Sequence, residues 1–325
     1  MITRRGVLQA AGVTGASVIA ARTGAALAAT STVKTAVGFD VPRGACDCHV
    51  HVFGDAKQFP FAAERSYTPP EASVQDLRDL QAALRFDRVV IVQPSVYGTD
   101  NSCTLDGIRQ LGARARGVAV IGPSTSASAI DEMAANGIRG VRLNLETAGQ
   151  FDPASAKRLL VSVAEQIRRH NWHIQFYTRL SVIAALKDDI AALPFPVVFD
   201  HFGGAKAALG TAQPGFDAML DLVKSGRAYV KISGAYRASE KSPDFLDATP
   251  LARAIVAANP DRVLWGTDWP HPGRGRTATD IAPPHVVDDG LLLNQLAAWV
   301  PDAPTRKKIL VDNPARLYGF EAIAL

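Results

Sequence analysis

Cysteine and histidine are scarce in this chain, and strongly basic clusters are missing from its sequence. With 3 cysteines in 325 residues, an odd and low count argues against a disulfide framework, and we expect packed thiols. No run of lysine or arginine stands out, which argues against nucleic acid or an anionic membrane surface as a partner. Hydrophobic residues make up 47% and charged residues 20% of the chain, the composition of an ordinary globular protein.

The N-terminal segment has the features of an export signal. Residues 3–9 (TRRGVLQ) resemble the twin-arginine motif, and an A-x-A sequence at 26–28 fits a cleavage site. Glycines and Arg22 interrupt the apolar stretch of about 20 residues that a membrane span needs. We therefore expect a periplasmic protein with no membrane segment after cleavage. The predicted division is a twin-arginine-type signal peptide at 1–28, an N-terminal extension at 29–45 and a single domain at 46–325.

Eight short segments rich in β-branched residues alternate with longer amphipathic ones. Near-continuous apolar runs of this kind suit parallel strands that are covered on both faces. The predicted strands are 46–53, 88–93, 117–122, 138–144, 172–178, 196–201, 228–233 and 262–268.

Helical patterns fill the gaps between these strands. Ser73 is a polar cap for one helix, whose leucines follow at spacings of three and four, and Asn136-Gly137 ends another. Eight strands with helices between them predict an α/β fold, a single-domain (β/α)8 TIM barrel. The alternative is an open doubly wound sheet, but no glycine-rich phosphate loop follows any strand.

Polar residues gather where the predicted strands end, which is where a barrel builds its active site. By its two-residue period, the first strand presents Asp47, His49 and His51 on one face. We interpret His170, His173 and His285 as structural. The other polar residues at or just beyond strand ends are Arg142, Asn144, Tyr177, Asp200, His201, Ser233, Arg237, Asp268 and His271.

Several of these residues carry a resemblance to a known family. DCHVHVFG on the first strand, DH on the sixth and GTDWPHP on the eighth resemble the amidohydrolase superfamily. The closing segment DNPARLYGF (312–320) is typical of the second large group of that superfamily, and the likeness covers nearly the whole mature chain.

A narrower resemblance points to the lactonase branch of this group. The segments FPF (59–61), YTP (67–69), VQPSVYGTDN (92–101), RGVRLN and KISGAYR are similar to those of 2-pyrone-4,6-dicarboxylate hydrolases, 4-sulfomuconolactone hydrolases and D-galactarolactone isomerases. The resemblance implies that Asp268 is the general base and that His49, His51, His201 and Tyr177 polarise the scissile carbonyl. It also implies that Arg142 and Arg237 bind substrate carboxylates, while the residues expected to line the pocket are Tyr67, Ser95 and His271.

The chain departs from the binuclear members of the superfamily. These bridge two metals with a carboxylated lysine or an acid on strand four and add a histidine on strand five, where this chain has Arg142 and Tyr177. We therefore expect either no metal or one divalent ion, zinc by preference, on His49, His51 and Asp268. The dicarboxylate hydrolases also use an additional arginine shortly after the one on strand four, and residues 145–148 (LETA) contain none.

The sequence thus predicts a hydrolase that opens a carboxylated or sulfonated lactone of the muconolactone or pyrone type in the catabolism of aromatic compounds. A carboxylate with a pKa near 3.9 is ionised at neutral pH and accepts the proton of an attacking water. A small anionic lactone is the expected partner. The sequence leaves open whether the protein forms a homo-oligomer. The alternatives are a lactone isomerase, a zinc-dependent decarboxylase, disfavoured by Tyr177 on strand five, and a non-catalytic periplasmic anion-binding protein.

Overall fold

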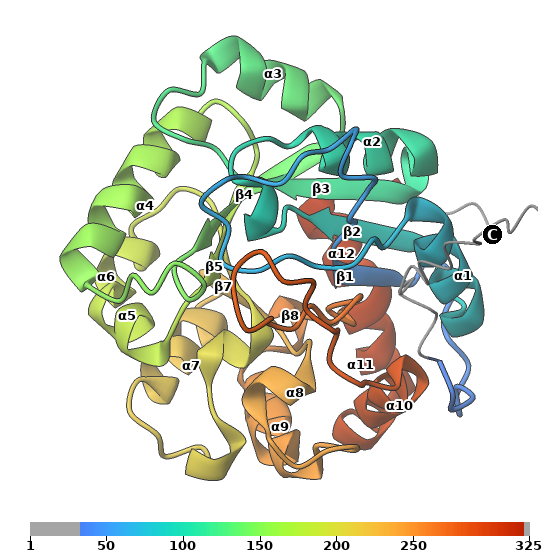
Figure 1. Cartoon of the computed structure of the whole chain (residues 1–325). Helices are drawn as coiled ribbons and strands as arrows, with labels where there is room; N and C mark the ends of the chain where they lie inside the picture. Colours follow the sequence, from blue (N-terminus) through green and yellow to red (C-terminus); the bar gives the residue numbers. More distant parts are fainter. Residues whose placement is uncertain (1–32, 322–325) are drawn as a thin grey trace, which may run out of the picture.

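The computed structural model describes residues 33–321, in which eight parallel strands form one barrel surrounded by helices (Figure 1). The strands follow the chain order around the barrel without a crossover. All eight strands predicted from the sequence are present, so the predicted TIM barrel is confirmed. The strands are β1 (Cys46–Val50), β2 (Arg88–Val92), β3 (Ala115–Ala119), β4 (Ile138–Asn144), β5 (His173–Tyr177), β6 (Val197–Phe199), β7 (Ala228–Lys231) and β8 (Val263–Leu264).

The last strand is shorter than predicted, and the chain beyond it closes the barrel. The Cys48 amide donates to the Trp265 carbonyl at 2.9 Å, and the Asp268 amide donates to the His49 carbonyl at 2.8 Å. A third bond joins the His51 amide to the Trp269 carbonyl at 2.8 Å. These bonds fix the segment after β8 against β1, so the ends of both strands meet at one seam.

Twelve α-helices cover the outside of the strands within the described residues. Ser73 caps the first of them as predicted, in a capping box with Asp76, and Gly137 follows the third with φ of +94°. A π-helical turn, Lys308–Asp312, precedes the last one. The helices are α1 (Val74–Leu84), α2 (Ser102–Leu111), α3 (Ala127–Ala135), α4 (Pro153–Ile167), α5 (Leu180–Ala185), α6 (Lys187–Ala191), α7 (Phe216–Lys224), α8 (Ala235–Ala238), α9 (Thr249–Ala258), α10 (Asp289–Trp299), α11 (Ala303–Lys307) and α12 (Asn313–Tyr318).

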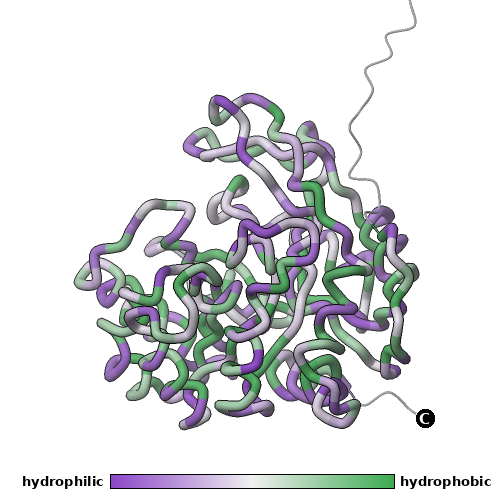
Figure 2. Tube along the Cα trace, turned by 90° about the horizontal axis from the view of Figure 1, so that it is seen from below, coloured by the Kyte–Doolittle hydropathy of each residue, from purple (hydrophilic) through white to green (hydrophobic). Residues whose placement is uncertain are grey.

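The hydrophobic core has two parts. The larger lies between the strands and the helices, and hydrophobic stretches accordingly run through the body of the molecule (Figure 2). The smaller gathers valines of the strands with Cys46, Cys48 and Tyr318 of α12. All three cysteines are buried and free, which confirms the expectation of packed thiols. No helix within residues 33–321 has both the length and the apolar character needed to cross a membrane.

The predicted signal peptide at 1–28 lies outside the described residues, so it and the periplasmic location stay predictions. The described part of the N-terminal extension packs near the start of α10. The Thr35 hydroxyl donates to the Asp288 carboxylate at 2.5 Å, and the Gly38 amide donates to Asn294 Oδ1 at 2.7 Å. These bonds tie the extension to the far end of the chain.

Candidate active site

An irregularity in β1 separates the two histidines from the acid that precedes them. The register of β1 against β2 shifts between Asp47 and Val50. The Asp47 carboxylate accepts from the Thr267 hydroxyl at 2.6 Å and from the Thr267 and His49 amides at 3.1 Å. Burial raises the pKa of Asp47 to about 7. The expectation of one shared face therefore holds for His49 and His51 only, because Asp47 joins the barrel seam instead.

Three histidines surround one oxygen of Asp268. The Nε2 atoms of His49, His51 and His201 lie 3.6, 3.5 and 3.8 Å from Asp268 Oδ1, respectively. These side chains come from the ends of β1, β6 and β8, and each is buried. The structure thus brings together four groups that the sequence placed at three separate strand ends.

The other ring nitrogen of each histidine has a fixed partner. Nδ1 of His51 lies 2.8 Å from the Val92 carbonyl, and Nδ1 of His49 lies 3.2 Å from Asp200 Oδ1. A carbonyl oxygen only accepts, so Nδ1 of His51 carries the proton, whereas Nδ1 of His49 lies between the Asp200 carboxylate and the Lys231 ammonium, 3.3 Å away. Nδ1 of His201 lies 3.0 Å from the Ser233 hydroxyl.

Burial also keeps these rings neutral near pH 7. It lowers the pKa of His49 well below its ordinary value, lowers that of His51, and lowers that of His201 to about 4. A neutral ring that is protonated on Nδ1 has a lone pair on Nε2. The lone pair of His51 Nε2 therefore points at the carboxylate oxygen of Asp268.

This convergence of electron-rich atoms suits one cation. Donor atoms of His49, His201 and Asp268 lie within 4.8 Å of one another. His49 Nε2 and Asp268 Oδ1 also have no hydrogen-bond partner among the described residues. Zinc with bonds of about 2.0–2.1 Å in a tetrahedron separates its ligand atoms by a little over 3 Å, close to the spacing here. This triad contains His201 rather than the predicted His51, whose Nε2 also lies 3.5 Å from Asp268 Oδ1, so the predicted metal set stays a prediction.

The second oxygen of Asp268 is held from the end of β7. Asp268 Oδ2 accepts from the Tyr236 hydroxyl at 2.6 Å and from Nε of Arg237. Burial by itself would raise the pKa of Asp268, but the charge of Arg237 holds that pKa well below the usual range. Asp268 is therefore an ionised carboxylate with only Oδ1 turned to the histidines. Tyr236 was missed from the sequence, where nothing sets it apart in the loop after β7.

The backbone at the site is strained. Asp268, His201 and His271 have φ values of +67°, +46° and +60°. A left-handed conformation in residues other than glycine costs of the order of 1–3 kcal/mol each. Gly234 lies beneath them with φ of +55°, and a Cβ there would come within 3.2 Å of Asp268 Oδ2 and His201 Nδ1.

A small cavity of about 60 Å³ lies above the histidines. Its wall includes five residues that the sequence predicted for substrate contact or catalysis, in addition to His51 and His201. His271 is not among the lining residues, because its Nε2 lies 3.0 Å from Asp289 Oδ1 and its ring contacts Tyr236. The predicted residues on the wall are Tyr67, Ser95, Arg142, Tyr177 and Arg237, and those not predicted are Asn144, Thr147, Pro272, Gly273 and Arg274.

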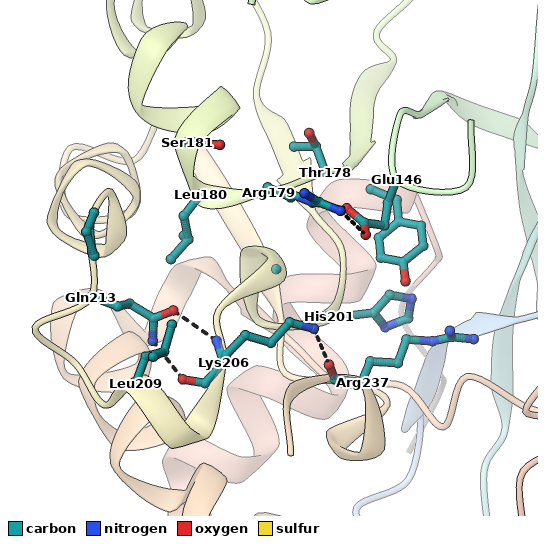
Figure 3. A pocket seen from close by; sticks show the side chains of 13 residues that line it. Glu146, Thr178, Arg179, Leu180, Ser181, His201, Lys206, Leu209, Gln213 and Arg237 are labelled. Atoms are coloured by element: carbon teal, nitrogen blue, oxygen red, sulfur yellow. Dashed lines mark hydrogen bonds and ion pairs between the residues drawn. The ribbon is translucent and has the colours of Figure 1, made fainter. Parts of the chain in front are cut away.

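A larger cavity of about 510 Å³ adjoins the first and shares Tyr177, His201 and Arg237 with it. In Figure 3, His201 and Arg237 point to the same side, away from Gln213. The Lys206 Nζ donates to the Arg237 carbonyl at 2.9 Å across this cavity. Open space therefore continues from the histidines toward the loops that follow β5, β6 and β7.

Buried charges lie directly behind His49. The Lys231 Nζ donates to Gln175 Oε1 at 2.7 Å and lies 3.5 Å from Asp200 Oδ1 and 3.3 Å from His49 Nδ1. Arg142 Nε lies 3.2 Å from Asp200 Oδ2. Burial lowers the pKa of Lys231, while Asp200 opposes that shift. Sequence reasoning missed Lys231 and Gln175; the only signal was a single lysine within the apolar run AYVKIS.

His173 begins β5, at the opposite end of the barrel from the site, and should make the fold acid-sensitive. Burial lowers its pKa from 6.5 to about 3. Between these pH values the unfolded chain binds a proton that the native protein does not, so stability falls as pH drops below 6.5. This residue alone should cost about 2–3 kcal/mol at pH 4.5.

Urea denaturation at pH 7.0 and 4.5 tests this expectation. The variant His173→Phe keeps a planar ring against Gly140, which pairs with residue 173 in the sheet. It should lose less stability than the wild-type protein on going from pH 7.0 to 4.5. Equal losses in the two proteins would contradict the assignment, whatever the variant's stability at pH 7.0.

Comparison with known proteins places the chain in a family. The Amidohydrolase family profile matches residues 46–320. The chain belongs to the amidohydrolase family. This amidohydrolase is 38% identical over 295 residues to the 2-pyrone-4,6-dicarboxylate hydrolase of Comamonas testosteroni, covering 88% of this chain and 93% of that one.

Two further proteins resemble this amidohydrolase over most of its length. A 4-sulfomuconolactone hydrolase of Hydrogenophaga intermedia is 36% identical over 284 residues, covering 86% of this chain and 90% of the relative. A crystal structure of a protein from Agrobacterium tumefaciens superposes with a TM-score of 0.74 at 27% identity, covering 87% of this chain and 98% of that one. The predicted family and the predicted fold are both confirmed.

Proposed function

We propose that this amidohydrolase opens the ester bond of a small anionic lactone of the muconolactone or pyrone type, in the catabolism of aromatic compounds. The observation that carries the proposal is an ionised, buried Asp268 whose free oxygen faces three histidines, beside a cavity lined by two arginines. The names of two relatives, a sulfomuconolactone hydrolase and a pyrone dicarboxylate hydrolase, support the same chemistry.

Asp268 acts as the general base. Its Oδ2 is occupied by Tyr236 and Arg237, so Oδ1 accepts the proton of the attacking water. Because the pKa of Asp268 is well below its usual range, the carboxylate is ready at neutral pH. Its basicity is correspondingly modest, and the carbonyl must therefore be polarised strongly for the water to attack.

The remaining groups position and polarise the lactone. Burial raises the pKa of Tyr177, so its hydroxyl stays protonated and can donate to the developing oxyanion. Arg142 and Arg237 each use Nε on a buried carboxylate, and Arg142 Nη1 also donates to the Gln93 carbonyl at 3.4 Å. Nη2 of Arg142 and the terminal amino groups of Arg237 are left for a carboxylate or sulfonate of the substrate. Fixing the ring in this way holds its carbonyl near Asp268.

We further propose that the histidine cluster takes one divalent ion, zinc by its donor set. His49, His201 and Asp268 would hold the ion, and His51 lies beside them. When bound, the ion supplies Lewis-acid polarisation of the carbonyl oxygen. The support is chemical: burial keeps the rings of His49 and His201 neutral, and His49 Nε2 and Asp268 Oδ1 have no hydrogen-bond partner among the described residues.

Measuring the metal content tests whether the proposed zinc ion is bound, independently of catalytic turnover. Protein purified with zinc present should contain about one equivalent by elemental analysis, and His201→Ala should lose most of it. His170→Ala is the matched control, because His170 pairs with Asp131 away from the site. Fully active wild-type protein with less than a tenth of an equivalent of any divalent metal would contradict the proposal.

A panel of lactones tests the reaction itself. Carboxylated and sulfonated muconolactones and pyrones, assayed with and without chelator, should include one that is converted to the ring-opened acid. Product analysis separates the alternatives, because an isomerase returns a lactone with a moved bond and a decarboxylase releases carbon dioxide. If the enzyme turns over none of these lactones, the proposal that it hydrolyses them is wrong.

A further inference from the structure

The loop between β8 and α10, residues 265–288, lies over the centre of the barrel and is tied down there (Figure 1). Thr68, in the segment after β1, bridges to Ile281. The Thr68 hydroxyl donates to the Ala278 carbonyl and the Ala282 amide donates to the Thr68 carbonyl, both at 2.7 Å. The loop is therefore held in place at the mouth, and Arg274 within it lines the cavity above the histidines.

Arg274 differs from the two other arginines on this wall. Arg142 and Arg237 are each bound through Nε to a buried carboxylate. Arg274 is exposed, and no hydrogen bond or ion pair of its side chain is found within residues 33–321. Its planar guanidinium is thus available to an anion at the mouth.

The charges around the cavity leave a positive surplus. Arg142, Arg237 and Lys231 face only two buried carboxylates, those of Asp200 and Asp268. Arg274 adds another positive charge at the rim. One anionic group of a substrate balances the buried surplus of one charge, which leaves the charge of Arg274 for a second anionic group.

The other basic residues near the cavities already have partners. Arg179 pairs with Glu146 at 3.1 Å and lies 3.5 Å over the ring of Phe151. Lys206 donates to the carbonyl of Arg237. Arg274 is therefore the residue on this wall best placed to receive a further anionic group.

We propose that Arg274 forms a second anion subsite, which binds a carboxylate or sulfonate on the far side of the substrate ring from the group held by Arg142 and Arg237. Asn144 and Thr147 line the same cavity and offer polar atoms to that group. The subsite rests on the proposed function for the identity of its substrate. It makes the enzyme selective for doubly charged lactones over singly charged ones, with the selectivity set by the β8–α10 loop.

Equilibrium binding of two stable probes tests the subsite without any turnover. Pyridine-2,4-dicarboxylate carries two carboxylates and pyridine-2-carboxylate carries one, and neither has an ester to hydrolyse. Titration calorimetry of the full-length protein should give a Kd ratio that favours the dicarboxylate. In Arg274→Met that ratio should fall about tenfold, the effect of losing one charge-assisted contact.

Arg276→Met is the matched control, because Arg276 is exposed on the same loop and does not line the cavity. It should leave the ratio unchanged, and the ratio should fall with added salt in the wild-type protein more steeply than in Arg274→Met. An unchanged ratio in Arg274→Met, an equal fall in Arg276→Met, or a failure of the wild-type protein to prefer the dicarboxylate would overturn the subsite. Failure of the lactone panel alone would overturn the reaction and leave this binding result standing.

Discussion

Replacing Asp268 with asparagine should lower kcat by about 10²–10⁴-fold, the usual contribution of a general base. The amide has nearly the shape of the carboxylate, and asparagine tolerates the left-handed backbone found at this position. The variant should therefore fold and bind pyridine-2,4-dicarboxylate with an affinity close to that of the wild-type protein. Steady-state kinetics on the best substrate of the lactone panel, together with calorimetry, measure both quantities.

Two controls separate loss of the base from loss of its surroundings. Tyr236→Phe removes the hydroxyl that donates to Asp268 Oδ2 and keeps the carboxylate, so its kcat should fall much less than that of Asp268→Asn. Metal content is determined on the same samples, because Asp268 is also a candidate ligand. A kcat for Asp268→Asn near the wild-type value would show that another group takes the proton.

Replacing Lys231 with methionine should destabilise the fold by about 3 kcal/mol, because it leaves the Asp200 carboxylate buried with less compensation. Lys231 and Asp200 are both fully buried, and their charged atoms lie 3.5 Å apart. Arg142 still contacts Asp200 in this variant, which places the cost at the low end of the usual range. Urea denaturation at pH 7 gives the free energy of unfolding.

The double variant Lys231→Met, Asp200→Asn tests whether the cost comes from the unpaired charge. Removing both charges should return at least half of the lost stability, since the amide of asparagine is far cheaper to bury than a carboxylate. If the double variant loses the sum of the stabilities lost by the two single variants, Lys231 and Asp200 contribute independently. The coupling energy between them would then be zero, which would contradict the prediction.

The barrel and the centre of the site could be predicted from the sequence because both follow from topology. Runs such as RVVIV and IRGVRLN reveal buried parallel strands, and a barrel brings the ends of all its strands to one face. His49, His201 and Asp268 therefore had to lie near one another, although more than 200 residues separate the first from the last.

Other parts of the site depend on tertiary contacts that leave no local pattern. The irregularity in β1 turns Asp47 to Thr267, a partner 220 residues away. Lys231 is acceptable inside the barrel only because Gln175 and Asp200 lie opposite it. The position of Arg274 depends on the contact between Thr68 and its own loop. A strand or loop pattern contains none of this information.

His271 was expected to line the pocket, and this prediction is wrong because a tertiary contact determines where its side chain lies. It follows Asp268 by three residues, in a stretch that was expected to line the pocket. Its backbone is left-handed, and its ring contacts Asp289 at the start of α10. The side chain therefore supports the site from behind, and the wall at this point is formed by the residues that follow it, Pro272 and Gly273.

The left-handed backbone at His201 and Asp268 also bears on how such a protein diverges. Glycine or asparagine would relieve local strain at position 201, whereas at position 268 glycine would also leave Arg237 without its buried carboxylate partner. Selection for stability alone therefore favours the loss of His201 but not that of Asp268. A descendant barrel that had lost its catalytic activity should change first at position 201 while its strands persist, and the residue there would distinguish an active enzyme from an inactive relative.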